Sequence, residues 1–101
     1  MGMANLQRMA QQMQQEMLRV QTELEATQVD GSAGGGVVKA VVTGKQELVS
    51  ITIDPDAVDP ADVDMLQDLI VAAVNDALRG SRELAEEKMA AVTGGLRIPG
   101  I

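Results

Sequence analysis

Leu48-Val-Ser-Ile-Thr-Ile53 and the residues that follow it, Asp54-Pro-Asp56 and Asp59-Pro-Ala-Asp62, decide the fold of this chain. The first six residues are rich in β-branched side chains and predict a strand. The Asp-Pro-Asp segment predicts a turn. Asp59 is a good N-cap and Pro60 suits a first helical position, so a long helix is predicted to begin there.

The predicted strand alternates in polarity, with Leu48, Ser50 and Thr52 on one side and Val49, Ile51 and Ile53 on the other. We expect one face to be buried and the other to face water. A second β-branched run, residues 37–43, is joined to it through Gly44 and predicts a hairpin. Residues 26–31 fit either the last helical turn or a first strand, which would make the sheet three-stranded. Glycines 31, 34, 35 and 36 are expected to supply turns rather than a phosphate loop, since a strand and not a helix follows them.

Two long helices are predicted to flank this sheet. Apolar or small residues recur in alternating steps of three and four in the first helix, which predicts packing along a narrow seam: Met3, Leu6, Ala10, Met13, Met17, Val20, Leu24 and Thr27. The second helix has a wide apolar stripe between Val63 and Leu78, as expected of a helix that covers a sheet. A narrower stripe continues to about Val92.

The predicted class is α/β in the α+β sense: a long helix, a small antiparallel three-stranded sheet or hairpin, and another long helix. We expect one domain, with a helical arm at 1–28, a sheet at 29–54, a long helix at 59–92 and a loose tail at 93–101. Strands of six residues span only ~20 Å and the second helix ~50 Å, so both helices should overhang the sheet in the same direction. Their exposed seams favour a homodimer that shares the sheet or the helices.

Composition narrows the chemistry. The chain has 101 residues, 46% of them hydrophobic, with seven Met and no aromatic residue, and a core of this kind is often completed by oligomerisation. It has no Cys for a disulfide or thiolate site, and no His to activate a serine, so we expect no enzyme, metal or cofactor. No signal peptide or membrane-spanning run is recognisable, which predicts a cytoplasmic protein.

Several motifs together resemble the YbaB/EbfC family of bacterial nucleoid-associated proteins, over about residue 5 to Gly95. They are Gly31-x-x-Gly34-x-Gly36-x-Val38, Gly44, Ile53-Asp54-Pro55, Leu66-x-Asp68-Leu69-Ile70-x-Ala72-Ala73-x-Asn75-Asp76-Ala77, Glu87-Lys88-Met89 and Thr93-Gly94-Gly95. The resemblance implies a tweezer-like homodimer with a central sheet and protruding helix pairs. It also implies binding to double-stranded DNA at the nucleoid, a change in DNA conformation, and roles in nucleoid organisation and gene expression.

The charges are unevenly distributed, although a net charge of −7 is not typical of a phosphate-binding protein. Residues 20–78 hold eleven acids and two lysines, a balance of −9, whereas residues 1–19 and 79–101 each carry +1. Such a distribution suits arms that approach DNA while the body is repelled. Six of the eight basic residues lie on the segments expected to project and are the candidate DNA contacts: Arg8, Arg19, Arg79, Arg82, Lys88 and Arg97.

Other interpretations of these residues stay open. Surface pairs such as Glu83 or Glu86 with Arg82 and Lys88 would explain the same charges as solvated helix faces. The acids between Asp54 and Asp64 lack the spacing of a calcium loop and fit capping roles. Glutamines near the start of the first helix fit solvated helix formers, or contacts to DNA.

Two rival functions remain beside DNA binding. One is a protein-interaction or chaperone-like module that clamps a partner between its helices, as in the helix–hairpin–helix layout of prefoldin subunits. The other is that the helices serve only to assemble the dimer. No small-molecule substrate or membrane partner is expected.

Overall fold

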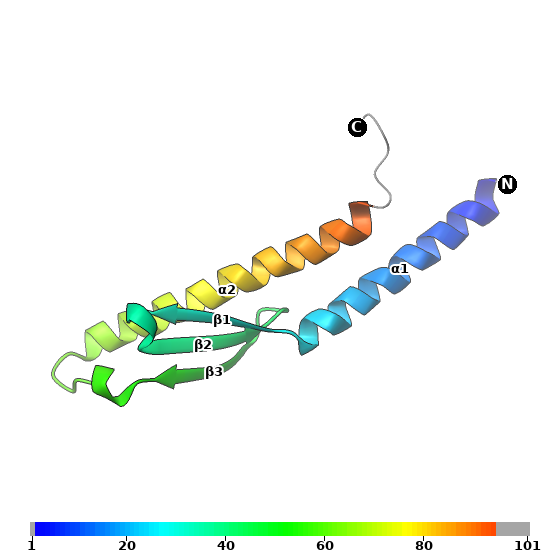
Figure 1. The fold of residues 1–101 in the computed structure, drawn as a ribbon. Helices are drawn as coiled ribbons and strands as arrows, with labels where there is room; N and C mark the ends of the chain where they lie inside the picture. Colours follow the sequence, from blue (N-terminus) through cyan, green and yellow to red (C-terminus); the bar gives the residue numbers. More distant parts are fainter. Residues whose placement is uncertain (1, 95–101) are drawn as a thin grey trace.

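The structure is a computed structural model that describes residues 2–94. In chain order it consists of a long helix, a three-stranded sheet and a second long helix (Figure 1). This confirms the α+β class. The elements are α1 (Gly2–Ala26), β1 (Gln28–Ala33), the 3-10 turn η1 (Gly34–Gly36), β2 (Val38–Thr43), β3 (Leu48–Ile53), the 3-10 turn η2 (Pro55–Ala57) and α2 (Val63–Gly94).

The sheet is antiparallel with the strand order β1-β2-β3. The residues left open between helix and strand turn out to begin β1, which pairs with β2 from Gln28 opposite Thr43 to Ala33 opposite Val38. β3 pairs with the other side of β2, with an irregularity at Val41/Val42. A three-stranded sheet, rather than a two-stranded hairpin, is therefore what α2 packs against.

Gly31 allows α2 to approach the sheet. It lies inside β1, and a Cβ atom added there would be 2.2 Å from the backbone N of Ala77 and 2.5 Å from the carbonyl O of Ala73. The prediction that Gly31 supplies a turn was wrong, because its role comes from this contact between distant segments. Gly34 to Gly36 do form the turn, and all three have positive φ angles.

The core lies between β2 and α2. Val38, Ala40 and Val42 are fully buried on one face of the sheet, against Ala73 and Ala77 of the helix. These small helix residues suit the close approach at Gly31. The wide apolar stripe predicted for the second helix therefore covers the sheet, as expected.

β3 lies outside this cover. Leu48 is 51% exposed, Val49 is 50% exposed and Ile51 is 37% exposed, and Ile53 at the end of the strand is partly buried against the core. The prediction that one face of this strand is buried was wrong for the single chain. The physical reason is that α2 packs over β1 and β2 and leaves the apolar side of β3 uncovered.

α2 begins at Val63, four residues later than predicted. The Asp59 side chain accepts a hydrogen bond from the backbone N of Ala61, at 2.9 Å, and holds a turn through Pro60. Asp62 caps the helix instead, since its Oδ1 accepts from the N of Met65 at 3.2 Å. Asp54 likewise caps η2. These acids serve capping, and no cluster of three His, Cys, Asp or Glu side chains within residues 2–94 could hold a metal ion.

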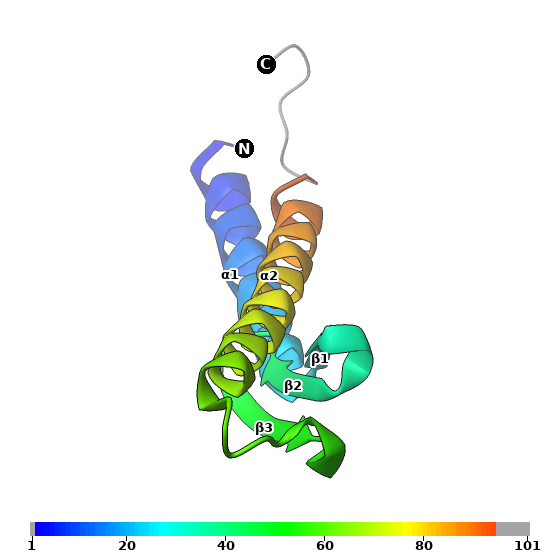
Figure 2. The same cartoon turned by 90° about the vertical axis from the view of Figure 1, so that its left-hand side faces the viewer.

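Both helices are attached to the turn between β2 and β3. The backbone N of Gly44 donates to the carbonyl oxygens of Leu24 (2.9 Å) and Thr27 (3.0 Å), at the end of α1. The hydroxyl of Ser81 in α2, which is fully buried, donates to the carbonyl O of Thr43 at 2.8 Å. The two helices consequently leave the sheet side by side and project in the same direction, as predicted (Figures 1 and 2).

The described chain is elongated, at 72 × 27 × 16 Å. Within residues 2–94, no helix combines the length and the apolar character needed to cross a membrane.

Gly31→Ala tests the close packing of β1 on α2. We expect a loss of about 1–3 kcal/mol of unfolding free energy, because the methyl group meets backbone atoms that cannot rotate away. Gly94→Ala is the matched control, since nothing lies within 4 Å of the Cβ it would add. Urea unfolding followed by circular dichroism measures both. Equal stabilities of the two variants would contradict this packing.

Candidate nucleic-acid interface

The two arms are α1 and residues 79–94 of α2, which extend beyond the sheet and run antiparallel (Figure 1). The contacts between them show how far each arm reaches. The Nζ atom of Lys88 in α2 lies 3.4 Å from Oε2 of Glu23 in α1. Further out, Glu16 and Val20 line one cleft with Val92. The last described turn of α2 is thus level with about Glu16, and α1 extends beyond it by about 14 residues, or ~20 Å.

The candidate cations are spread along these arms rather than gathered at the tips. Arg8 lies on the outermost part of α1. Arg19 and Lys88 lie midway, and Arg79 and Arg82 flank Ser81 at the base, beside the sheet. From the level of Arg82 to that of Arg8 the cations span about 30 Å along the arms, close to one turn of duplex DNA. Arg97 lies outside the described residues.

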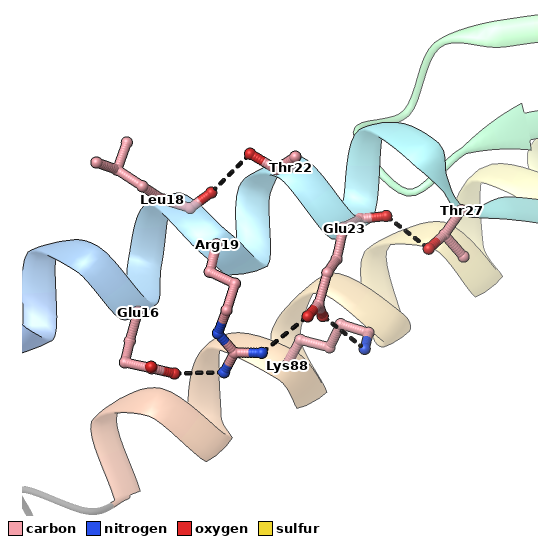
Figure 3. A network of polar contacts seen from close by, with 7 residues as sticks. All are labelled: Glu16, Leu18, Arg19, Thr22, Glu23, Thr27 and Lys88. Carbon is pink, nitrogen blue, oxygen red and sulfur yellow. Dashed lines mark hydrogen bonds and ion pairs between the residues drawn. The ribbon is translucent and has the colours of Figure 1, made fainter.

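The midway cations are engaged in an ion-pair network (Figure 3). Nη1 of Arg19 lies 2.8 Å from Oε1 of Glu23, and Nη2 contacts Oε2 of Glu16. Lys88 contacts the second oxygen of Glu23. The hydrogen bond from Arg19, and then its charge, lower the pKa of Glu16, and Glu16 raises the pKa of Arg19 in return.

The two arginines at the base differ. Nη1 of Arg79 lies 3.5 Å from Oδ1 of Asp76, whose other oxygen accepts a hydrogen bond from the backbone N of Ser32. Arg82 is exposed, and within residues 2–94 neither it nor Arg8 takes part in an ion pair. Those two guanidinium groups are therefore the arm cations most available to an external anion.

Sequence reasoning missed the partner of Lys88. The expected pairs were with Glu83 or Glu86 on the same helix, but the observed partner, Glu23, is 65 residues away in the chain. Helical spacing signals only neighbours three or four residues apart, as for Arg19 with Glu16 and Glu23. To predict a contact between two helices, one must know their relative register, and no local sequence pattern gives that register.

The acidic segment lies at the opposite end of the molecule. β3 runs away from the turn that anchors the arms, so η2 and the start of α2 lie at the end of the sheet remote from the tips (Figure 1). That end carries the five acids Asp54, Asp56, Asp59, Asp62 and Asp64. The described molecule consequently has a strongly negative end, whereas the arms, residues 2–26 and 79–94, carry five cations and six acids. An anionic polymer is therefore repelled less at the arms than at that end.

Comparison with known proteins gives close relatives over almost the full length. A nucleoid-associated protein of Moorella thermoacetica is 55% identical over 103 residues, which cover 99% of this chain and 99% of the relative. One of Chloroflexus aggregans is 55% identical over 97 residues, covering 96% of this chain and 97% of the relative.

A solved structure has the same fold. An uncharacterised protein from Helicobacter pylori superposes with a TM-score of 0.77 at 23% identity, covering 96% of this chain and 99% of that one. The model of the YbaB/EbfC DNA-binding family matches residues 1–96. Because this match spans nearly the whole sequence and the relatives are about half identical, the chain belongs to the YbaB/EbfC DNA-binding family.

Proposed function

We propose that this protein binds double-stranded DNA at the nucleoid as a homodimer, through its helical arms, and changes the conformation of the DNA. Effects on nucleoid organisation and gene expression follow from that change. The observation that carries the proposal is the uneven charge along the molecule: five of its eight cations lie on the arms, where acids and cations nearly balance, and a run of unbalanced acids lies at the far end of the sheet. The family is a DNA-binding one rather than a class of enzymes, and we propose no catalytic step or cofactor.

The chemistry of the arms favours contacts to the phosphate backbone. The chain has no aromatic residue on which unpaired bases could stack. A few arginines per chain predict modest affinity and a modest salt dependence. The cations span ~30 Å along the arms, about one helical turn of duplex, and the absence of aromatic residues for stacking favours double-stranded DNA over a single strand.

The uncovered side of β3 supports the homodimer. Ile51 lies opposite Ala40 in the ladder, so its side chain is on the same sheet face as the core, yet no helix of its own chain covers it. β3 is also an edge strand with an unpaired side. α2 offers further exposed apolar residues near its start: Val63, Met65 and Val71.

A second copy of the chain is the occupant that these features favour. Under two-fold symmetry the same patch is used twice, and α2 of each copy can cover β3 of the other. In such a dimer the small core of each copy would be completed by the helix of the other copy. It would also present two arm pairs, a tweezer-like arrangement that doubles the number of cations facing the DNA.

A protein-clamping function is the second candidate. It is favoured by the apolar side chains on the outer turns of α1, of which Met3 is 76% exposed and Leu6 is 63% exposed. The double variant Met3→Ser/Leu6→Ser should abolish capture of an unfolded client if clamping is the function, and should leave DNA affinity unchanged if it is not. Arg82→Glu should weaken DNA binding and leave capture of an unfolded client unchanged.

Arg8→Gln and Arg82→Gln test DNA binding by the arms. Each should weaken binding to a duplex about three- to tenfold at physiological salt and lower the salt slope by ~1 for each phosphate that is no longer neutralised. Fluorescence anisotropy across a salt series measures both. Lys39→Gln is the matched control, because Lys39 is an exposed cation of β2 in the sheet. Absence of salt-sensitive binding at micromolar wild-type protein, or an equal loss for the control, would overturn the proposal.

Ile51→Lys tests the dimer surface. A charge buried between two copies without a partner should dissociate them, so the mass in sedimentation equilibrium should fall from twice 10.6 kDa to 10.6 kDa. Leu18→Lys is the control, since Leu18 is an exposed apolar residue of α1. If Ile51→Lys keeps the mass of the wild type, the dimer uses another surface.

A further inference from the structure

Glu23 occupies an unusual position between the arms, because both of its carboxylate oxygens are used by cations. Oε1 accepts from Arg19 at 2.8 Å, and Oε2 accepts from Lys88 of the other helix at 3.4 Å (Figure 3). Glu16 takes the remaining terminal nitrogen of Arg19. Each terminal nitrogen of Arg19 is thus occupied by an oxygen of a different carboxylate, and these are the nitrogens that a phosphate would bind.

We propose that Glu16 and Glu23 act as internal substitutes for DNA phosphates, holding Arg19 and Lys88 until the DNA displaces them. This inference rests on the proposed function, since it concerns how the same arms bind DNA. The two carboxylates cancel the charge of the two cations in the free protein. They lower its affinity for DNA and leave Arg8 and Arg82 to make the first contacts.

The network is accessible enough for such an exchange. The side chains of Glu23 and Lys88 are 41% and 36% exposed, and those of Arg19 and Glu16 are more exposed. Ion pairs this open to water are weak and are screened by salt, so a polyanion can compete for the cations. An open cleft of about 240 Å³ between the arms is lined by all four residues and gives a phosphate group room to approach.

A purely structural role for Glu23 predicts different behaviour. If the network only ties α1 to α2, removing the carboxylate loosens the arms and either weakens DNA binding or leaves it unchanged. If the carboxylate competes with phosphate, removing it frees two cations and strengthens binding. The sign of the change therefore separates the two roles.

The test measures the affinity of Glu23→Gln for duplex DNA across a salt series. We expect about three- to tenfold tighter binding and a steeper salt slope, by ~1 for each additional phosphate that the freed cations neutralise. Glu86→Gln is the matched control: it removes the same charge from an exposed acid of α2 that belongs to none of the described ion pairs. Glu16→Gln, which does not touch α2 in this network, should shift affinity in the same direction by a smaller factor.

Dependence on Lys88 completes the test. Glu23→Gln is also measured in a Lys88→Gln background. The fold-increase in DNA affinity should there be less than half of the fold-increase in the wild-type background, because one of the two cations that the substitution releases is absent. The proposal is overturned if Glu23→Gln binds no more tightly than Glu86→Gln, or if its effect is equal with and without Lys88. Circular dichroism checks that helicity is retained, and Glu16→Gln decides the outcome if Glu23→Gln loses it. Should wild type and all variants fail to bind DNA, the proposed function itself is wrong.

Discussion

The turn at Thr43–Gly44 is the constraint on which the rest of the structure depends. The single peptide group between these two residues holds both helices, since the Gly44 N–H donates to carbonyl oxygens at the end of α1 and the Thr43 carbonyl accepts from the buried Ser81 of α2. A side chain at Gly44 is excluded, because its Cβ would lie 2.7 Å from the Leu24 carbonyl O. One tight turn therefore sets the direction of two long arms.

The positions of the charged segments in space follow from that attachment. Helices that leave the same end of a short sheet must overhang it, and the chain that connects β3 to α2 must lie at the other end. Asp54, Asp59 and Asp62 there accept hydrogen bonds from local N–H groups, and the acids keep that end negative, whereas five of the cations lie on the arms. The orientation toward DNA that we propose would thus be a consequence of topology, and in the proposed dimer the few free cations of each chain would be present twice.

The sequence allowed prediction of what depends on local patterns. β3 was predicted at its observed bounds because six residues, four of them β-branched, lie between clear turn residues, and the motifs identified the family. The start of α2 was misplaced because Asp59 and Asp62 both fit a cap and only geometry selects between them. Gly31 and Glu23 owe their roles to partners 46 and 65 residues away, and the exposure of β3 follows from the packing of α2 over β1 and β2.

The measurement that tests the central claim most directly is a titration of isotope-labelled protein with a short duplex, followed by backbone amide chemical shifts. DNA held by the arms should shift resonances of residues 2–23 and 79–94 and leave those of residues 54–64 in place. Shifts centred on residues 54–64, or on the sheet with the arms unaffected, would contradict an interface that runs along the helices.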